Sequence, residues 1–181
     1  YAGVANVSPA SVSNGVTSRQ ASGTTLAAID ADVGFAMQAF ASAELHTPAA
    51  VWIMTPGQAI TLSLIRNTQG YPAFPTIGME GGTWYGLPVI TSNNVVSNGS
   101  PGEQQVFLVD QSEILLADDG QMNIDMSTEA SLQMDGAPSA GAQSLVSMFQ
   151  NGQVALKVDR WINWAKRRTA AVQYIEQTQR W

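Results

Sequence analysis

Cysteine is absent from the 181 residues, and this absence excludes a disulfide framework, a thiolate metal site and a cysteine nucleophile. Histidine is nearly absent too. His46 is the only one, so a zinc site is excluded and a Ser-His-Asp arrangement would have to use this residue. Because His46 precedes Thr47-Pro48 at an expected helix end, we predict a structural or exposed role for it.

Long apolar runs are missing as well. No stretch of eighteen apolar residues occurs, so no membrane span is predicted. The first residues contain no charged segment followed by an apolar one, so no signal peptide is predicted. The chain starts at Tyr1 instead of Met, and we therefore expect a processed product or an excised fragment.

Charge is scarce and unevenly divided. Charged residues make up 12% of the chain, whereas globular proteins typically carry about 25%. This scarcity favours a subunit that hides surface in an assembly, or a secreted protein with a neutral polar coat. The net charge of −6 separates into −10 for residues 1–150 and +4 for residues 151–181. The asymmetry suits head-to-tail contacts between subunits, a small patch facing nucleic acid, or a solvated strand edge.

The candidate site residues lie at this basic end of the chain, where tryptophans are interspersed with bases. We predict a subunit interface formed by Lys157, Arg160, Trp161, Trp164, Lys166, Arg167 and Arg168. A mixture of this kind also suits stacking on nucleic acid. In a third interpretation the tryptophans fill the core or a subunit contact, and the bases lie at a turn. The acidic chain, with a pI near 4.5, favours this third interpretation over nucleic-acid binding.

No catalytic residue, cofactor site or metal site is predicted. Asp118-Asp119-Gly120 with Asp125 does not have the spacing of the twelve-residue calcium loop, so we expect a hairpin turn there. Asp30 and Asp32 fall on different faces of a predicted helix and do not make a glycosidase-type pair.

The first third of the chain predicts an irregular lead-in over residues 1–25, and then helix, strand and helix. Apolar residues at three- and four-residue steps indicate a helix over residues 24–45, capped by Thr24 or Thr25. The apolar run at residues 51–54 indicates a buried strand. Thr55-Pro56 then begins a second helix, which we expect to end at Asn67 or Gly70.

A sheet corner is predicted within Gly81–Asn93. Glycine permits positive φ and proline fixes φ, so we expect a strand over Thr83–Tyr85, a corner over Gly86–Pro88 and a strand over Val89–Thr91.

The second half of the chain predicts mostly strands. Residues 105–110 and 113–117 are expected to be buried strands, with a helical turn around Ser112 as the alternative. Residues 122–127 are expected to be a half-buried strand, because apolar and polar residues alternate there. Residues 128–143 are expected to form a loop, and residues 144–150 one or two helical turns. A strand over residues 154–164 and a last strand over residues 171–175 flank the basic interruption.

Five motifs follow one another along the chain. The run Val51-Trp52-Ile53-Met54-Thr55-Pro56 comes first and Gly81–Ile90 second. Val109–Ile114, Ser127–Met134 and Phe149–Trp164 come later. In this order they resemble the major capsid proteins of tailed bacteriophages. The first two resemble the family's strand-to-helix start and the corner that follows it, and the last three resemble a later strand pair, an "S-E-A" segment and the family's ending. The resemblance covers most of residues 24–176.

This resemblance implies an α+β fold, the Hong-Kong-97-type phage major capsid protein fold. We expect an axial domain with a central mixed sheet flanked by helices, plus part of the peripheral-domain sheet. The implied divisions are residues 1–23 as a lead-in from the peripheral region, 24–143 as the axial domain and 144–181 as closing strands of the peripheral domain. No long spine helix and no E-loop hairpin is predicted here. The chain therefore resembles the C-terminal part of such a protein, and no cross-linking lysine is carried over.

The function implied by the resemblance is that of a structural subunit of an icosahedral phage or prophage head. The expected partners are other copies of the chain in pentamers and hexamers, with portal, scaffold or maturation protease as further partners. Packaged DNA is expected to be an indirect partner, and no membrane or cofactor is expected. The expected location is the virion capsid, assembled in the bacterial cytoplasm. The alternatives are a phage maturation protease or other hydrolase, and a nucleic-acid-binding module that uses the basic segment.

Overall fold

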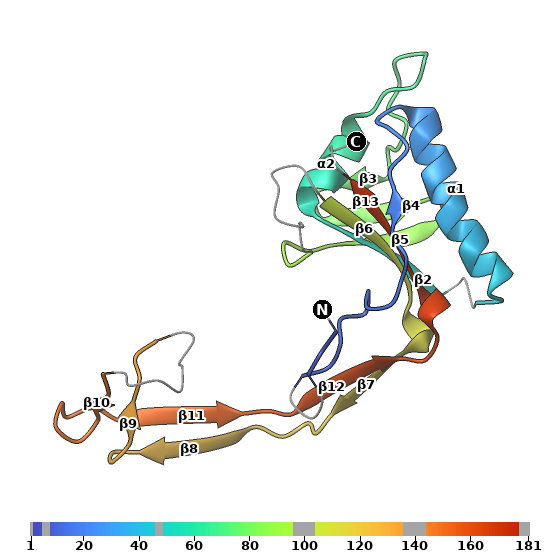
Figure 1. Cartoon of the computed structure of the whole chain (residues 1–181). Coiled ribbons are helices and arrows are strands. Elements are labelled where there is room, and N and C mark those ends of the chain that lie inside the picture. The colour runs from blue at the N-terminus through green and yellow to red at the C-terminus, as the bar shows by residue number, and fades with distance from the viewer. Residues whose placement is uncertain (1, 5–7, 46–48, 96–103, 136–143, 178–181) are drawn as a thin grey trace. The chain divides into compact units, whose positions relative to one another are not determined.

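The computed structural model describes residues 2–4, 8–45, 49–95, 104–135 and 144–177 (Figure 1). The chain forms two compact units. Residues 1–116 and 164–181 form the first, called the sheet unit, and residues 117–163 form the second, called the ribbon unit. The predicted His46 position lies outside the described residues.

Helix α1, Leu26–Ser42, confirms the first predicted helix. The side chain of Thr25 caps it by accepting a hydrogen bond from the backbone of Ala28. Its buried stripe includes Ile29, Val33 and Phe40. The helix ends earlier than predicted because Glu44 has a φ of 52° and the N–H of Leu45 turns back to the carbonyl of Phe40.

The second strand and helix also follow the prediction. Strand β2 covers Ala50–Met54 and helix α2 covers Pro56–Leu64. Thr55 and Gln58 form a reciprocal capping box at the start of α2. The helix ends before the predicted Asn67, because Ile65 is already extended. The side chain of Asn67 instead accepts hydrogen bonds from the backbone of Gln69 and Tyr71 within the following loop.

Seven of the described strands form one mixed sheet in the order β1-β13-β6-β2-β5-β4-β3 (Figure 1). Besides β2 they are β1 (Arg19–Gln20), β3 (Ile77–Gly78), β4 (Gly81–Trp84), β5 (Leu87–Thr91), β6 (Gln104–Asp110) and β13 (Val172–Gln177). Strand β6 is antiparallel to both β13 and β2, whereas β2 and β5 are parallel. The first and last of the described strands are neighbours in this sheet, because β1 pairs with β13.

The main core lies between this sheet and the two helices. Trp52 and Trp84 are fully buried at its centre, with ring centroids 4.8 Å apart. Burying side chains of this size stabilises the fold by about 25 cal/mol per Å² of apolar surface. A second, smaller cluster contains Val51, Val109 and Val172, and Val12 of the lead-in packs against it. The predicted irregular lead-in therefore covers part of the sheet.

The predicted corner is a two-residue turn between β4 and β5. Its central residues both have positive φ, 48° at Tyr85 and 79° at Gly86, which defines a type I′ hairpin turn. The predicted bounds of the corner were therefore wrong, because Tyr85 belongs to the turn and Pro88 to β5. Pro88 lies opposite Thr83 and before Val89, the first residue paired with β2, so neither ladder needs an N–H from it.

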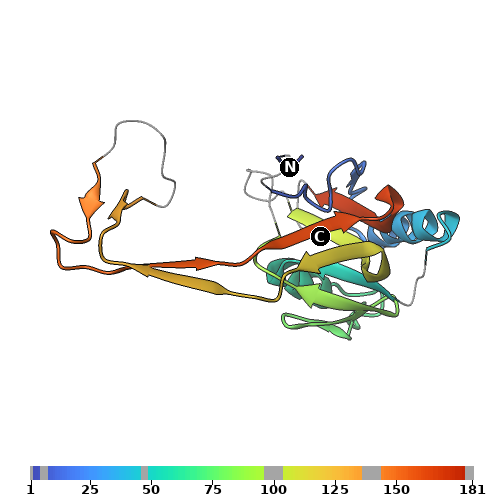
Figure 2. The ribbon, with the colours of Figure 1, turned by 90° about the horizontal axis from the view of Figure 1, so that it is seen from below.

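Three antiparallel strand pairs lie wholly or partly in the described part of the ribbon unit (Figure 2). The pairs are β7 (Ile114–Asp118) with β12 (Ile162–Lys166), β8 (Asn123–Ser127) with β11 (Ala155–Asp159), and β9 (Ser131–Leu132) with β10 (Val146–Ser147). Strands β7 and β12 carry the chain between the two units. Two short 3₁₀ turns lie in this region: Gln111–Glu113, where the chain leaves the sheet after β6, and Thr169–Ala171, where it returns before β13. We call these two segments the chain crossings.

Several predictions for this region were wrong. Strand β7 is mostly exposed and pairs with β12, so residues 118–120 do not form a hairpin with β8. The side chains of Asp118 and Asp119 instead accept backbone hydrogen bonds two residues on, which bends the chain without reversing it. Strand β8 is exposed along its whole length, not half-buried as predicted. Residues 144–150 contain β10 in place of helical turns. The single strand predicted over residues 154–164 is interrupted between β11 and β12.

The two units are not the predicted domains. Strand β13 belongs to the sheet unit, whereas β8 and β9 belong to the ribbon unit. The division into a lead-in (1–23), an axial domain (24–143) and closing strands of the peripheral domain (144–181) stays a prediction.

Candidate assembly surfaces

The seven predicted interface residues divide between the two units. Lys157, Arg160 and Trp161 belong to the ribbon unit. The Nζ atom of Lys157 lies 2.5 Å from Asp159, and this hydrogen bond raises the pKa of the lysine. Arg160 forms an ion pair with Asp118, with 3.1 Å between Nε and Oδ1, and the pKa of the Asp118 carboxyl is lowered as a result. Trp161 is 73% exposed, so it remains available to a partner.

The other four residues belong to the sheet unit, where two of them hold the lead-in segment. The indole N–H of Trp164 donates to the carbonyl of Ala10 at 2.9 Å. The ammonium group of Lys166 donates to the carbonyls of Val12 and Asn14, and burial lowers its pKa. Both side chains therefore have intramolecular roles, and a contact of either with another subunit stays a prediction.

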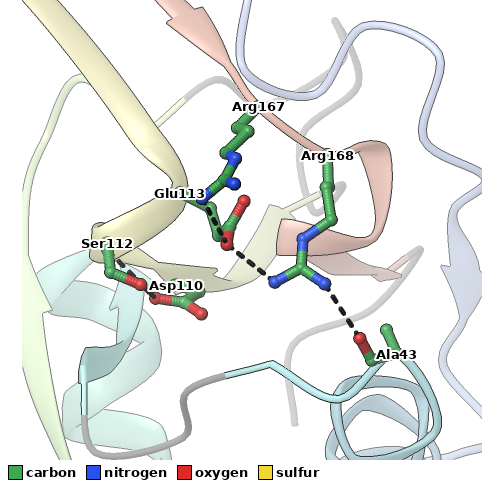
Figure 3. Close-up of polar contacts among 6 residues, drawn as sticks. All are labelled: Ala43, Asp110, Ser112, Glu113, Arg167 and Arg168. Carbon is green, nitrogen blue, oxygen red and sulfur yellow. Dashed lines mark hydrogen bonds and ion pairs between the residues drawn. The ribbon is translucent and has the colours of Figure 1, made fainter.

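Arg167 and Arg168 lie beside Glu113 at the chain crossings (Figure 3). Arg168 Nη2 is 2.7 Å from Glu113 Oε1, and Arg168 Nη1 donates to the carbonyl of Ala43 at 3.1 Å. The hydrogen bond from Arg168 holds the pKa of the Glu113 carboxyl below its ordinary value, although burial opposes the shift. Arg167 Nη1 is farther away, at 4.0 Å from Glu113 Oε1. Sequence reasoning missed Glu113, because the partners of a single acidic residue are set by the tertiary fold.

The ribbon unit exposes a continuous apolar surface. In the β8–β11 ladder Ile124 faces Val158 and Met126 faces Leu156, and facing residues lie on the same side of a ribbon. Met122 and Val154 continue the alternation just outside these strands. All six are more than half exposed, from 51% at Val158 to 75% at Met126. We call these six residues the apolar ribbon face.

The opposite side of the same ribbon is polar. It carries Asn123, Asp125, Lys157 and Asp159, whose positions alternate with those of the apolar residues. Alternation within β8 was visible in the sequence, but the matching register of β11 was not. A two-stranded ribbon is at best marginally stable alone in water, and exposed apolar patches of this kind mark sites of interaction.

The candidate catalytic groups do not form a catalytic constellation in the described residues. Asp30 accepts a hydrogen bond from the hydroxyl of Tyr85, whose pKa is raised by burial and by this bond. Asp32 is fully buried and accepts from Ser22 and Arg19. Within the described ranges, no three His, Cys, Asp or Glu side chains gather as a metal site. No helix in the described part of the chain is long and apolar enough to cross a membrane.

Comparison with known proteins shows the family of this chain. The sequence profile of the Phage capsid family matches residues 3–176, so the chain belongs to the phage capsid family. The capsid polyprotein of Pseudomonas phage PAJU2 is 44% identical over 177 residues. That match includes 96% of this chain but only 26% of the polyprotein, so the chain spans about a quarter of this relative's length.

Solved structures show the same fold at low sequence identity. A chain from Mycobacterium phage Ogopogo superimposes with a TM-score of 0.63 at 16% identity, covering 96% of this chain and 57% of that one. A chain from Gordonia phage Cozz superimposes with a TM-score of 0.57 at 15% identity, covering 94% of this chain and 54% of that one. The predicted phage capsid fold, with a mixed sheet and flanking helices, is confirmed.

Proposed function

We propose that this chain is part of the structural subunit of an icosahedral phage or prophage head, and that copies of the subunit assemble into pentamers and hexamers around the genome. The observation that supports this most is the apolar ribbon face, because it exposes six apolar side chains that need cover from further protein. Membership of the phage capsid family and the low content of charged residues agree with it.

The same proposal places the protein in the virion capsid after assembly in the bacterial cytoplasm. It assigns no catalytic role to the chain, and it makes packaged DNA an indirect partner. Portal, scaffold and maturation protease are further partners under this proposal. The intramolecular bonds of Lys166 and Arg168 weaken the nucleic-acid-binding alternative, because these two cations already have carbonyl or carboxylate partners.

Within this proposal, Trp161 with Arg160 and Lys157 contributes to contacts between subunits, because these three side chains lie at the surface of the ribbon unit. Trp164, Lys166, Arg167 and Arg168 contribute to assembly indirectly, by fixing the lead-in and the chain crossings.

Negative-stain electron microscopy of the full-length gene product, expressed alone and purified, tests the proposal. We expect closed shells, tubes or isolated capsomers, together with a sedimentation profile much faster than that of a monomer. A product that stays strictly monomeric, at concentrations at which its folding is verified by circular dichroism, would refute the proposed function.

A further inference from the structure

A groove opens beside the edge strand β1 in the sheet unit, where the lead-in runs along the sheet toward the start of α1 (Figure 1). It is lined by residues 15–20 of the lead-in, by Phe35 of α1, and by Thr169, Ala170 and Gln173. Its volume is about 480 Å³, which lies within the range of about 300–1,000 Å³ of sites that bury a drug-sized molecule. The groove is therefore large enough for two side chains of a partner.

The wall of the groove combines an aromatic ring with a cation. The guanidinium carbon of Arg19 lies 4.8 Å from the centroid of the Phe35 ring, and Phe35 is 47% exposed. Arg19 Nε donates to Asp32 and Arg19 Nη2 donates to Ser22, both at 3.3 Å. These two bonds hold the guanidinium in place, and because the group has five N–H donors it can also bind a second carboxylate. The groove thus suits an apolar side chain next to an acidic one.

Such a pair of side chains projects from the turn between β3 and β4. Met79 and Glu80 form this turn, because Gly78 is the register partner of Gly81. Met79 is 62% exposed, and Glu80 is exposed as well. Among the ion pairs of the described residues, none includes Glu80. We call Met79 and Glu80 the hairpin tip.

The hairpin tip and the groove belong to opposite edges of the sheet. In the described strands β1 is one end of the seven-stranded order and β3 is the other. At about 4.8 Å between neighbouring strands, these edges lie about 29 Å apart, so a hairpin tip does not reach the groove of its own copy. Both edge strands are only two residues long. They therefore offer little backbone to another sheet, and a contact between copies depends on side chains.

We propose that the hairpin tip of one copy enters the groove of the next copy, where Met79 packs on Phe35 and Glu80 pairs with Arg19. Charge supports a second copy as the occupant, because residues 1–150 contain twelve acidic residues and only two basic ones, of which Arg19 is one. Two different surfaces of one chain then meet head to tail, which is the kind of contact that closes a ring. The inference rests on the proposed function, since it names one interface of the proposed head subunit.

Disulfide trapping in the full-length gene product tests this contact. The 181 residues contain no cysteine, and Thr17 in the groove and Met79 in the hairpin tip are both exposed. A disulfide needs two Cβ atoms about 3.5–4.5 Å apart, so it forms only where the two positions meet. We expect Thr17→Cys and Met79→Cys copies, expressed together and oxidised, to form a disulfide-linked pair with one copy of each. Either variant alone should give at least about tenfold less linked product, and peptide mass spectrometry identifies the linked cysteines.

Ala41→Cys is the matched control for the groove position. Ala41 is exposed on α1, and it lies six residues after Phe35, which places it about 120° around the helix from that ring. Together with Met79→Cys it should give no more linked product than either variant alone.

The charge of Glu80 provides a second measurement in the same experiment. Adding E80K to the Met79→Cys copy brings a second cation to Arg19, so the yield of the linked pair should fall about tenfold. E80Q removes the charge at nearly constant size and should give an intermediate yield. An unchanged yield in E80K would overturn the pairing of Glu80 with Arg19.

Electron microscopy of the same samples separates a failure of this contact from a failure of the proposed function. Assembled particles without a disulfide between the Thr17 and Met79 positions would overturn the contact and leave the proposed function standing, and this is the result expected if another segment fills the groove. An equal yield from Met79→Cys alone would overturn the head-to-tail arrangement, because the hairpin tip would then meet its own copy in the neighbour. A folded product that stays monomeric and forms no disulfide would overturn both.

Discussion

Asp32 is a buried charge in α1 whose partners come from the segment before the helix. Its carboxylate accepts from the N–H of Ser22 at 2.7 Å, from the Ser22 hydroxyl at 2.5 Å and from Arg19 Nε at 3.3 Å. The side chain of Arg19 is 39% exposed, so part of the charge interaction is screened by water. The role of Asp32 is therefore to anchor the lead-in and β1 on α1.

We predict that Asp32→Ala lowers the free energy of unfolding by about 2–3 kcal/mol, because it leaves the Ser22 donors without their buried acceptor. Chemical denaturation followed by tryptophan fluorescence measures this loss. Gln38→Ala, an exposed change in the same helix, is the control and should change the stability by less than about 0.5 kcal/mol. A loss as small as that of the control in Asp32→Ala would contradict the anchoring role.

The glycines around β4 differ sharply in what a side chain would meet. A Cβ atom on Gly82 would lie 2.0 Å from the carbonyl oxygen of Thr76, at a φ of +136°. A Cβ atom on Gly86 would meet nothing within 4 Å, and only its φ of +79° disfavours a side chain. Close approach of backbone to backbone thus requires Gly82, whereas Gly86 is required by the turn alone.

We predict that Gly82→Ala destabilises the protein by about 3 kcal/mol or more and that Gly86→Ala costs only about 1 kcal/mol. Gly86→Asn should be tolerated, because Asn adopts the left-handed region readily, whereas Gly86→Val should impair folding or assembly. Thermal unfolding of the four variants gives the ranking. Equal losses for Gly82→Ala and Gly86→Ala would show that the carbonyl of Thr76 moves away freely.

Among the elements, those that depend on local signals could be predicted from the sequence. Thr55-Pro56 placed the start of α2 correctly because a capping side chain and proline act on neighbouring residues. The apolar stripe of α1 and the buried run at β2 likewise identified helix and strand. Their ends were less accurate, since Glu44 and Ile65 end the helices through backbone conformations that their residue types do not require.

Elements that depend on distant partners could not be predicted in full. The alternation of Ile124 and Met126 indicated which side chains share a face of β8, but it carries no information on whether another layer covers that face. The two Asp residues before Gly120 suggested a hairpin, whereas the actual partner of β7 is β12, more than forty residues later. For the candidate site, the sequence identified Arg167 and Arg168 but could not show that Glu113 is their partner.

The start of α2 offers a test at the level of one element. The Thr55 hydroxyl accepts from the N–H of Gln58, and the Gln58 side chain accepts from the N–H of Thr55. We predict that Thr55→Ala lowers the free energy of unfolding by about 1 kcal/mol, because the first turn of α2 loses its cap. Thr55→Ser keeps the hydroxyl and should retain most of the stability. Denaturant titration compares the two, and an equal loss in both would contradict the capping role.

Arg168 joins Glu113 to Ala43 at the end of α1, and the acid sensitivity of this contact follows from the Glu113 carboxyl. Its pKa in the folded protein lies below the ordinary value of 4.5 because of the hydrogen bond from Arg168. A carboxyl with a lowered folded pKa adds stability above its ordinary pKa and loses it as the pH falls through the lowered value.

We therefore predict that the difference in Tm between the parent protein and E113Q is constant above pH 4.5 and shrinks steadily below it. Differential scanning calorimetry from neutral to acidic pH measures this difference. Gln38→Ala, an exposed change that removes no ionisable group, is the control and should show a Tm difference that does not vary with pH. A Tm difference for E113Q that grows on acidification would contradict the lowered pKa of the Glu113 carboxyl.

At the scale of the whole molecule, the two units differ in how far their large apolar side chains are buried. The sheet unit has a continuous core around Trp52 and Trp84, whereas the ribbon unit leaves most of its large apolar side chains exposed. A protein that stayed a monomer in water would be prone to aggregate through such a surface. The charge scarcity noted in the sequence is consistent with a chain that finds cover for this surface in a larger assembly.

The two sides of the β8–β11 ribbon provide matched variants for testing whether the apolar ribbon face is covered in an assembly. Ile124→Ser and Leu156→Ser change the apolar ribbon face, while Asn123→Ser and Asp125→Ser change its polar side within the same strand pair. All four positions are exposed, so none removes a buried contact of the isolated chain. Each variant should therefore keep the unfolding behaviour of the sheet unit, which makes an assembly defect separable from a folding defect.

We predict that Ile124→Ser and Leu156→Ser reduce the yield of shells by about tenfold or more, since each removes apolar contact area worth about 1–2 kcal/mol in every copy of a repeated interface. Asn123→Ser and Asp125→Ser should leave the yield close to that of the parent protein. Electron microscopy and velocity sedimentation of the full-length gene product count the assembled particles. Normal shells from both apolar-face variants would mean that this face stays in water, and a defect confined to the polar side would move the interface to the other side of the ribbon.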